Sequence, residues 1–494
     1  MIRLIPGCGL AFALALVAAP PASAVSGETI ARQLRAGKAV VLLGAHVTGE
    51  LDLRETDVPA IFKCRGCTFS GGVAASDATF ERTVDLSGSE FKARVDLSGA
   101  TFRAPALFRV ALVETGKRRD DRPATFRRDA DFSFATFDDV VSFARSEFSR
   151  AGVFRDTRFA DANFASAEFM QAGDFERASF RGVASFNRAT SRGPASFAES
   201  DFRRGAHFVQ TTFKAGAVFN NAQFAEGASF LNARFEPSKR SDEAARFQSI
   251  AAEGSLDFTF ATFATGENTT SLGRARVIVI FEDVVCGESV VFRETTFGGE
   301  HRIAMVRLDV RDLVLDVDVV RQIDGTGNKR TVLEKLEESA KARGDLSDAN
   351  DAHYTLLALR SDNYWAGWRA LDYIFYRGIA GYFVRPFRPL LVLLAIATVL
   401  SLLRFVRRPT SASAGSRDSR VSRIGARVRT GGSEFLTYFL DTLSSVKSGR
   451  IADDTTPAVG ERIEVFVYRL LLVCALIGLA NSNPTLREMF DTLV

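Results

Sequence analysis

Cys64 and Cys67, separated by Arg65 and Gly66, form a C-x-x-C pair. Such a pair can form a disulfide, take part in thiol–disulfide exchange, or supply half of a zinc site. No second pair and no nearby histidine accompanies it, so the spacing is poor for zinc and metal or redox catalysis is disfavoured. In an exported chain we expect a disulfide. The alternative is that both side chains simply fill positions in a capping segment.

Other catalytic side chains are scarce, since the chain of 494 residues has four histidines and five cysteines. Cys286 and Cys474 have no evident partner, and no phosphate loop, G-x-G-x-x-G or G-x-S-x-G motif occurs. Carboxylates recur at positions expected to face solvent, where they alternate with arginine, at Asp131, Asp156, Asp161, Asp174 and Asp201. We expect a solvated face there, and therefore no enzyme, no cofactor, no metal and no small-molecule substrate.

The element that must position these side chains is a repeat centred on phenylalanine. Phe occurs 43 times, against 7 Tyr and 2 Trp, which indicates one repeated structural position. Two interleaved ladders each advance by 11 residues and together alternate steps of five and six. One contains Phe164, Phe175, Phe186, Phe197, Phe208, Phe219 and Phe230; the other contains Phe169, Phe180, Phe202, Phe213, Phe224 and Phe235, with Ser191 in one place.

A small residue stands two positions before most of these phenylalanines, as at Ala162, Ala167 and Ala178. A helix buries positions at a spacing of 3.6 and a strand at a spacing of 2, so neither explains the pattern. It fits a coil that turns a corner about every five residues. The large side chain then points to the axis, and the small one packs beside it.

The triplets Ala162-Asn163-Phe164 and Ala130-Asp131-Phe132 match the pattern A(D/N)LXX with Phe at its centre. Residues 64–300 thus resemble the pentapeptide-repeat family. The resemblance implies a mainly β fold, a right-handed quadrilateral β-helix with four repeats per turn. With the observed spacing, one turn takes about 22 residues and alternate corners carry an extra residue.

We assign residues 69–300 to this β-helix, with about seven turns between Phe80 and Phe235. Residues 25–68 are expected to cap the N-terminal end. Residues 276–320, which are rich in Val and Ile, are expected to close the other end as irregular coils.

Two stretches break the repeat, a charged insertion from Val113 to Pro123 and a second insertion at 236–246. We expect solvated loops at both. The more specific alternative is that these loops contact a binding partner, because binding residues often lie on loops of a rigid scaffold.

The N-terminus has the features of an export signal over residues 1–24. Arg3 precedes an apolar stretch from Leu10 to Ala19, and Ala22-Ser23-Ala24 is a small-residue cleavage site. The alternative is an uncleaved anchor. Both interpretations place the next domain on the outer side of a membrane.

The last third loses the phenylalanine period. Residues 301–363 are expected to end the β-helix and form a helical hairpin broken at Arg343-Gly344-Asp345, with Leu333 and Leu357 among its apolar positions. Aromatic residues, including both tryptophans, then gather in a juxtamembrane segment at 364–388.

Two apolar runs follow, at 389–406 and 465–481, which we expect to be transmembrane helices. The loop between them, 407–462, is rich in arginine, and the positive-inside rule places it in the cytoplasm. The β-helix domain would then be extracytoplasmic. This end weakly resembles a two-span ion-channel-like module found in some membrane-bound members of the family, but Lys447 stands where a potassium filter would need backbone carbonyls.

We therefore expect a bacterial envelope scaffold anchored in the membrane, whose partner is an unknown envelope protein or wall component. One alternative is a channel-like or signalling membrane protein. Another is a DNA mimic that binds a topoisomerase, which needs a strongly acidic rod. Residues 51–240 hold about 25 acidic and 28 basic side chains, so this charge disfavours the mimic, and the formal net charge of +4 gives no drive toward nucleic acid.

Overall fold

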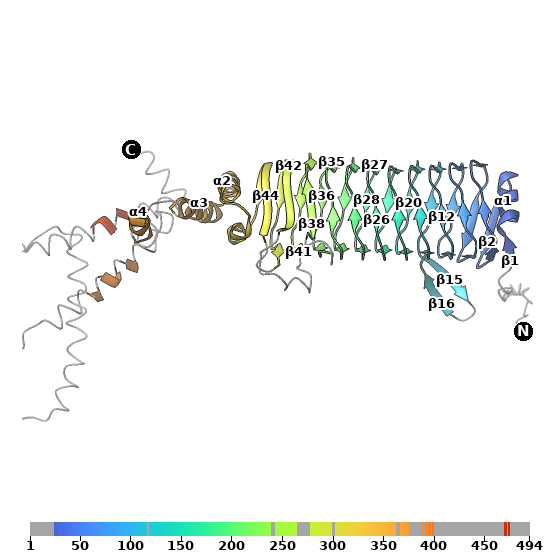
Figure 1. The fold of residues 1–494 in the computed structure, drawn as a ribbon, viewed down its shortest axis with the longest axis horizontal. Coiled ribbons are helices and arrows are strands. Elements are labelled where there is room, and N and C mark those ends of the chain that lie inside the picture. Colours follow the sequence, from blue (N-terminus) through green and yellow to red (C-terminus); the bar gives the residue numbers. More distant parts are fainter. Residues whose placement is uncertain are drawn as a thin grey trace, which may run out of the picture. The chain divides into compact units, whose positions relative to one another are not determined.

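The chain divides into two compact units, Met1–Asn328 and Lys329–Val494. Most of the first unit is a stack of coils formed by the chain from Val40 to Val314. The computed structural model describes residues 24–115, 118–238, 243–263, 277–298, 302–361 and 366–374, with scattered positions between 388 and 474. Parallel strands stack in register along the first unit, and the longest ladder has twelve strands, which corresponds to about twelve coils (Figure 1). The predicted β-helix is thereby confirmed.

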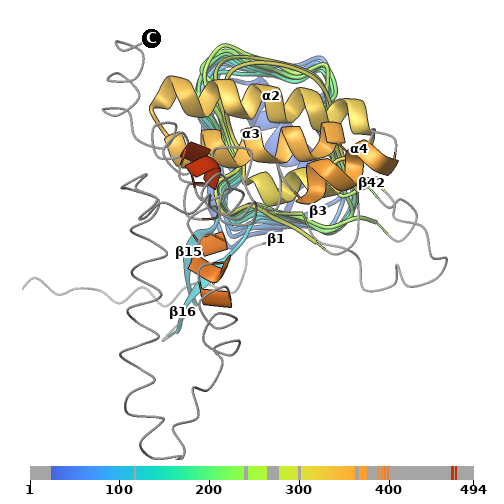
Figure 2. The ribbon, with the colours of Figure 1, turned by 90° about the vertical axis from the view of Figure 1, so that its left-hand side faces the viewer.

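Each coil has four faces, and each face contributes a short strand that pairs with the same face of neighbouring coils (Figure 2). The first face contains β1 (Ala24–Ser26), β3 (His46–Thr48), β7 (Thr68–Phe69), β11 (Glu90–Phe91), β17 (Thr125–Phe126), β21 (Glu147–Phe148), β25 (Glu168–Phe169), β29 (Thr190–Ser191), β33 (Thr212–Phe213), β37 (Arg234–Phe235), β41 (Thr262–Phe263) and β43 (Thr296–Phe297). The second contains β4 (Leu51–Asp52), β8 (Val73–Ala74), β12 (Val95–Asp96), β18 (Ala130–Asp131), β22 (Gly152–Val153), β26 (Gly173–Asp174), β30 (Ala195–Ser196), β34 (Ala217–Val218) and β38 (Ala245–Gln248).

The other two faces follow the same rule. The third contains β5 (Asp57–Val58), β9 (Thr79–Phe80), β13 (Thr101–Phe102), β19 (Thr136–Phe137), β23 (Arg158–Phe159), β27 (Ser179–Phe180), β31 (Asp201–Phe202), β35 (Gln223–Phe224) and β39 (Ala251–Ala252). The fourth contains β2 (Val40–Leu43), β6 (Phe62–Arg65), β10 (Val84–Asp85), β14 (Ala106–Leu107), β20 (Val141–Ser142), β24 (Ala162–Asn163), β28 (Ala184–Ser185), β32 (Ala206–His207), β36 (Ala228–Ser229) and β40 (Leu256–Asp257). Most paired positions lie 22 residues apart, as predicted; Phe180 and Phe202 are an example.

The alternation of five and six residues arises because the corners differ in length. Between the second and third faces, and between the fourth and first, four residues form a turn closed by a hydrogen bond from residue i+3 to residue i. The Ala178 N–H, for example, donates to the Phe175 carbonyl at 3.1 Å. The third residue of such a turn has a positive φ, as at Arg177 (56°) and Arg188 (59°), which a type II turn requires. We call these corners turn edges. The other two corners are shorter bends, which we call bend edges.

The phenylalanine ladders separate into four columns, because successive members of a ladder lie on opposite faces. Within a column the rings stack, and the centroids of Phe164 and Phe186 are 5.0 Å apart at an interplanar angle of 1°. Between columns they meet edge to face, as Phe175 and Phe186 do at 5.1 Å and 88°. Both geometries suit the ring quadrupole. Each predicted core phenylalanine is at most 3% exposed, namely Phe164, Phe169, Phe175, Phe180, Phe186, Phe197, Phe202, Phe208, Phe213, Phe219, Phe224, Phe230 and Phe235.

One column is interrupted at Ser191, which pairs in register with Phe169 on one side and Phe213 on the other. Ser191 is 4% exposed, and its hydroxyl donates to the Gly193 carbonyl at 2.8 Å. The substitution is tolerated because the buried hydroxyl has a hydrogen-bond partner of its own.

Helix α1 (Gly27–Arg35) covers the N-terminal end of the stack, where it packs on β2, β4 and β5 (Figure 1). Its apolar face, with Ile30 and Leu34, is buried. Ala24 of β1 already pairs with His46 of β3, and the continuous coils begin at Val40, so the stack extends into the segment 25–68 that was expected to be a cap. Ala24 already belongs to β1, and the rest of the predicted signal peptide lies outside the described residues.

The opposite end is closed by two long strands, β42 (Val277–Val291) and β44 (Arg302–Val314), which continue the second, third and fourth faces. The 3₁₀ helix η1 (Val317–Gln322) follows. We predicted irregular coils at 276–320, and the described residues there do continue the coils, since Asp283 and Arg307 keep the positive φ of a turn edge. The irregularity is limited to register shifts between Val277 and Val279 and between Cys286 and Ser289, because Val and Ile pack well on a pleated strand and the pairing runs on as long strands.

The predicted helical hairpin consists of α2 (Thr326–Arg343) and α3 (Leu346–Ser361), with the break at Gly344 and Asp345, and all of it from Lys329 onward belongs to the second unit. Glu337 joins the two helices through a hydrogen bond between its carboxylate and His353 Nδ1 at 3.0 Å. Leu333 is buried as expected, whereas on α3 Leu356 rather than Leu357 is buried.

The short helix α4 (Ala366–Leu371) lies in the predicted juxtamembrane segment 364–388. In the described part of the chain, no helix is long and apolar enough to cross a membrane. The predicted spans at 389–406 and 465–481, the loop 407–462 and the channel-like filter region lie outside the described residues except for scattered positions.

We expect Phe186→Ala to destabilise the coil by about 3–5 kcal/mol, because it removes a ring that contacts others on two sides and leaves a cavity. Phe134→Ala is the matched control, since Phe134 is 62% exposed, and it should stay within about 0.5 kcal/mol of the parent. Urea unfolding of the full chain measures both. Equal effects of the two substitutions would contradict the assignment of the core.

Candidate functional site

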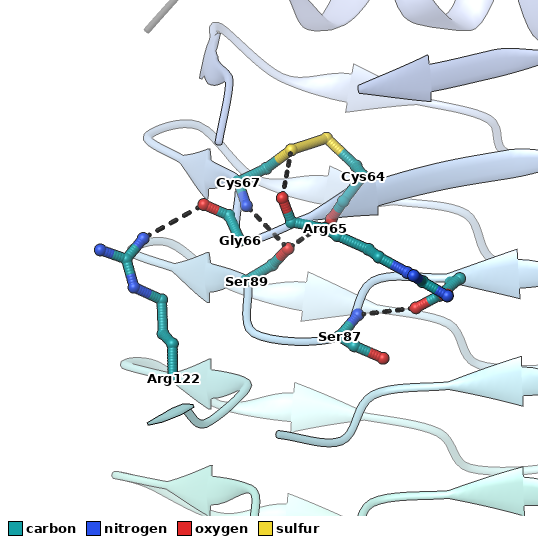
Figure 3. The surroundings of a disulfide bond; sticks show 8 residues. Cys64, Arg65, Gly66, Cys67, Ser87, Ser89 and Arg122 are labelled. Atoms are coloured by element: carbon teal, nitrogen blue, oxygen red, sulfur yellow. Dashed lines mark hydrogen bonds and ion pairs between the residues drawn. A yellow bond between two sulfur atoms is a disulfide. The ribbon is translucent and has the colours of Figure 1, made fainter. Parts of the chain in front are cut away.

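Cys64 and Cys67 lie at the turn edge between the fourth and first faces and are joined by a disulfide (Figure 3). Cys64 occupies the inward position that phenylalanine takes in later coils, and Cys67 occupies the small-residue position. Gly66 between them supplies the positive φ of the turn, 65°. Both cysteines are 0% exposed, so an external thiol cannot reach them without local opening. The position suits a structural closure.

A serine from the next coil completes this turn. The Cys67 N–H donates to Ser89 Oγ at 3.1 Å, and the Ser89 hydroxyl donates to the Cys64 carbonyl at 2.6 Å (Figure 3). In many later coils the turn is closed by a direct backbone hydrogen bond. Here the disulfide provides the closure, and the hydroxyl satisfies the two backbone groups.

The same use of a buried hydroxyl recurs along the stack. The Thr157 hydroxyl donates to the Phe132 carbonyl at 2.8 Å, and the Thr211 hydroxyl donates to the Phe186 carbonyl at 2.7 Å. Serine and threonine at the small-residue position therefore link successive coils, which alanine cannot do.

Two charged contacts surround the disulfide turn. Arg65 forms an ion pair with Asp85 of the adjacent coil at 2.5 Å, and the Asp85 carboxylate is 1% exposed. That carboxylate also accepts a hydrogen bond from the Ser87 N–H at 3.2 Å. Arg122 donates to the Gly66 carbonyl at 3.1 Å (Figure 3). The turn is thus held by its neighbouring coil and by an inserted segment.

That inserted segment is a β-hairpin, β15 (Ala111–Thr115) paired antiparallel with β16 (Arg118–Arg122), which projects from the coils in Figure 1. Arg145 of a later coil pairs with Asp121 at 3.1 Å. We predicted a solvated loop for the charged insertion. That prediction was wrong about its secondary structure, because the two halves of the insertion pair with each other as antiparallel strands. The second insertion, 236–246, is described only at its ends.

The recurrent carboxylates serve the turns rather than forming a free solvated face. The second position of the A-D-F triplet precedes a turn edge, and its side chain accepts a backbone N–H two residues later. Asp131 accepts from Ser133 at 3.0 Å and Asp174 from Glu176 at 3.2 Å. This is the Asx-type capping that favours Asp or Asn there.

The other carboxylates that were predicted to be solvated also have partners. Asp161 accepts from the Val183 N–H at 2.8 Å, and Asp201 accepts from Arg203 at 2.9 Å. Asp156 receives two hydrogen bonds from Arg177, each 2.9 Å long, which raise the pKa of the guanidinium.

Asp52 shows how such pairing affects titration. The hydrogen bond from the Arg54 side chain, assisted by its backbone N–H, lowers the pKa of the Asp52 carboxyl from 3.8 to about 2. The stabilisation is therefore present above pH 3.8 and is lost as the pH falls toward 2. It is small, because solvent screens an exposed pair.

Among the described residues, no group of three or more His, Cys, Asp or Glu side chains could hold a metal ion. Small cavities with an apolar lining lie inside the coils near each end; Leu53 and Leu97 line one, and Ile250 and Leu256 line another. The most distinctive surface features are therefore the hairpin and the charged edges.

Ser89, Asp85 and Arg122 were missed from the sequence. Their partners are 20 to 56 residues away, so the contacts depend on the register of the coils. A serine at a position usually held by alanine was the one available signal for Ser89.

A family model described as pentapeptide repeats, in nine copies, matches residues 65–111 and 175–219. No curated protein and no solved structure matches the chain.

We expect Ser89→Ala to destabilise the first coils by about 1–3 kcal/mol, because it leaves the Cys67 N–H and the Cys64 carbonyl buried without a partner. Ser133→Ala, which removes a hydroxyl from a half-buried turn residue, is the control. Hydrogen exchange should speed up at residues 62–91 and remain unchanged at 206–230, because each coil contacts only its neighbours. Uniform acceleration along the stack would contradict this.

Proposed function

Because the coiled domain belongs to the pentapeptide-repeat family, we propose that the protein is a non-enzymatic scaffold that is anchored in the membrane and displays its coils at the cell envelope. A closed core of stacked phenylalanines supports this proposal, since it leaves the outer surface as the place for recognition. Loops and insertions on a rigid framework commonly carry binding.

The observation that carries the proposal is the β15–β16 hairpin. It is a thirteen-residue lengthening of the regular repeat, since Glu90 pairs in register with Thr125 rather than with a residue 22 positions on. Its base is fixed to the coils by Arg122 and Asp121. A projecting element with a rigid base is preorganised for a protein partner, because little conformational freedom is lost on binding.

The membrane part of the proposal rests on the sequence. The export signal at 1–24 and the arginine-rich loop at 407–462 independently favour the same topology, with the coils outside and the loop in the cytoplasm.

A photo-reactive amino acid at Arg119, on β16, should cross-link to a discrete envelope protein in intact cells, because the hairpin projects from the coils. The control position is Arg204, exposed on a bend edge. Equal thermal unfolding midpoints of the two variants would show that both are folded. The same adducts at both positions, or none at Arg119, would remove the hairpin as the contact site.

We expect a protease-sensitive tag after residue 300 to be cleaved in wall-free cells, while a tag near residue 415 stays protected until the membrane is opened. The reason is that the two tags lie on opposite sides of the first predicted span. A reversed pattern would overturn the envelope location and favour a cytoplasmic partner.

A further inference from the structure

The bend edge between the first and second faces carries an excess of positive charge. In seven consecutive coils it is formed by residues 70–72, 92–94, 127–129, 149–151, 170–172, 192–194 and 214–216. Its basic residues, which we call the basic edge, are Lys92, Arg94, Arg127, Arg128, Arg150, Arg192 and Lys214. The same positions hold one acidic residue, Asp129.

The opposite bend edge, between the third and fourth faces, provides an internal comparison. Its basic residues over the matching coils are Arg82, Arg103, Arg181, Arg203 and Arg204, and its acidic residues are Glu81, Asp138, Asp139, Asp161 and Glu226. That edge is balanced. The charge on the basic edge is therefore specific to one corner of the coil and does not follow from the repeat itself.

The basic edge is straight and regular because its backbone continues the strand register. The Arg127 N–H donates to the Phe91 carbonyl and the Arg192 N–H to the Phe169 carbonyl, at 2.9 and 2.8 Å. Equivalent positions in adjacent coils are thus separated by about one strand spacing, ~4.8 Å. Of the six coils from 92 to 216, only the one with residues 170–172 lacks a basic side chain there.

Four of the seven cations have no ion-pair partner among the described residues: Lys92, Arg128, Arg150 and Lys214. All four are exposed. The other three are shared with carboxylates of the adjoining faces, as in Arg127 with Glu90 at 2.9 Å. The four cations without an ion-pair partner are therefore available to bind an external anion.

Carboxylates flank the basic edge on both sides. Glu90, Glu147 and Glu168 project from the first face, and Asp96, Asp131 and Asp174 from the second. A ligand that spreads onto either face would meet these acidic side chains. The arrangement favours a narrow anion that stays on the corner.

We propose that the basic edge binds a linear acidic polysaccharide lying along the stack. A polyuronate carries one carboxylate per sugar ring, so its extended chain presents a repeating row of negative charges to cations that recur at the ~4.8 Å rise of the coils. Arginine and lysine recognise such carboxylates through charge-assisted hydrogen bonds. The chain is thin enough to avoid the flanking carboxylates.

Other polyanions fit less well. Duplex DNA carries one charge per ~1.7 Å of its axis on a wide, helical surface, so it would contact the acidic flanks. A bilayer of anionic lipids is flat and would do the same. This inference goes beyond the hairpin contact proposed above and uses a different surface.

The test measures binding of a fluorescent oligogalacturonate of about ten sugars to the full-length protein, with a maltodextrin of equal length as the neutral control. The test variant is Lys92→Ala, Arg128→Ala, Arg150→Ala and Lys214→Ala combined. The matched control combines Arg82→Ala, Arg109→Ala, Arg158→Ala and Arg204→Ala, which removes the same charge from exposed positions elsewhere. Thermal unfolding shows that each is folded, and the single substitution Arg128→Glu serves as a milder variant.

We expect the basic-edge variant to bind at least about tenfold more weakly, with a smaller dependence of affinity on salt. The control should stay within about twofold of the parent, and Arg128→Glu should lie between them. An equal loss in both fourfold variants would overturn the proposal. So would wild-type binding no tighter than to maltodextrin, or tighter binding to anionic vesicles or duplex DNA. Cross-linking at the hairpin measures a different contact from polysaccharide binding at the basic edge. Failure of one proposal is therefore distinguishable from failure of the other.

Discussion

The stacking of phenylalanine rings from successive coils is the interaction on which the rest of this structure depends. A ring such as Phe186 is placed between Phe164 and Phe208 only if the chain returns to the same face after 22 residues. A slip of one residue would turn the rings outward, because neighbouring strand positions point to opposite sides. The corners must therefore return each strand to the register of the previous coil, and in a regular coil four-residue turns alternate with three-residue bends to achieve it.

This constraint also decides where variation is possible. The interior accepts few changes, and where a polar residue enters it, as at Ser191 or Ser89, its hydroxyl has a hydrogen-bond partner. Extra residues leave the coil at a corner, as the β15–β16 hairpin does. The outer surface then consists of straight lines of side chains at a constant rise. Such lines suit an extended partner better than a compact small molecule, which needs a concave pocket.

Local spacing made much of the fold predictable. The period of 11 placed the core phenylalanines from Phe164 to Phe235, whereas the buried rings of Phe108, Phe247 and Phe281 were not predicted. The predictions of secondary structure that the structure corrects share one cause, since both concern places where the phenylalanine period stops. Val277–Val291 and Arg302–Val314 run as long strands around three faces and keep left-handed corner residues at Asp283 and Arg307, and the charged insertion pairs with itself. In both places strand pairing replaces the pattern as the determinant.

The sequence by itself determined the 22-residue coil, its aromatic core and the C-x-x-C pair, because these follow from residues close together in the chain. Only the tertiary structure decided that Ser89 reaches the Cys64–Cys67 turn, that Asp85 is buried beneath Arg65, and that seven dispersed basic residues share one edge. Those relations join residues about 20 or more apart, and they exist only once the register of the stack is fixed.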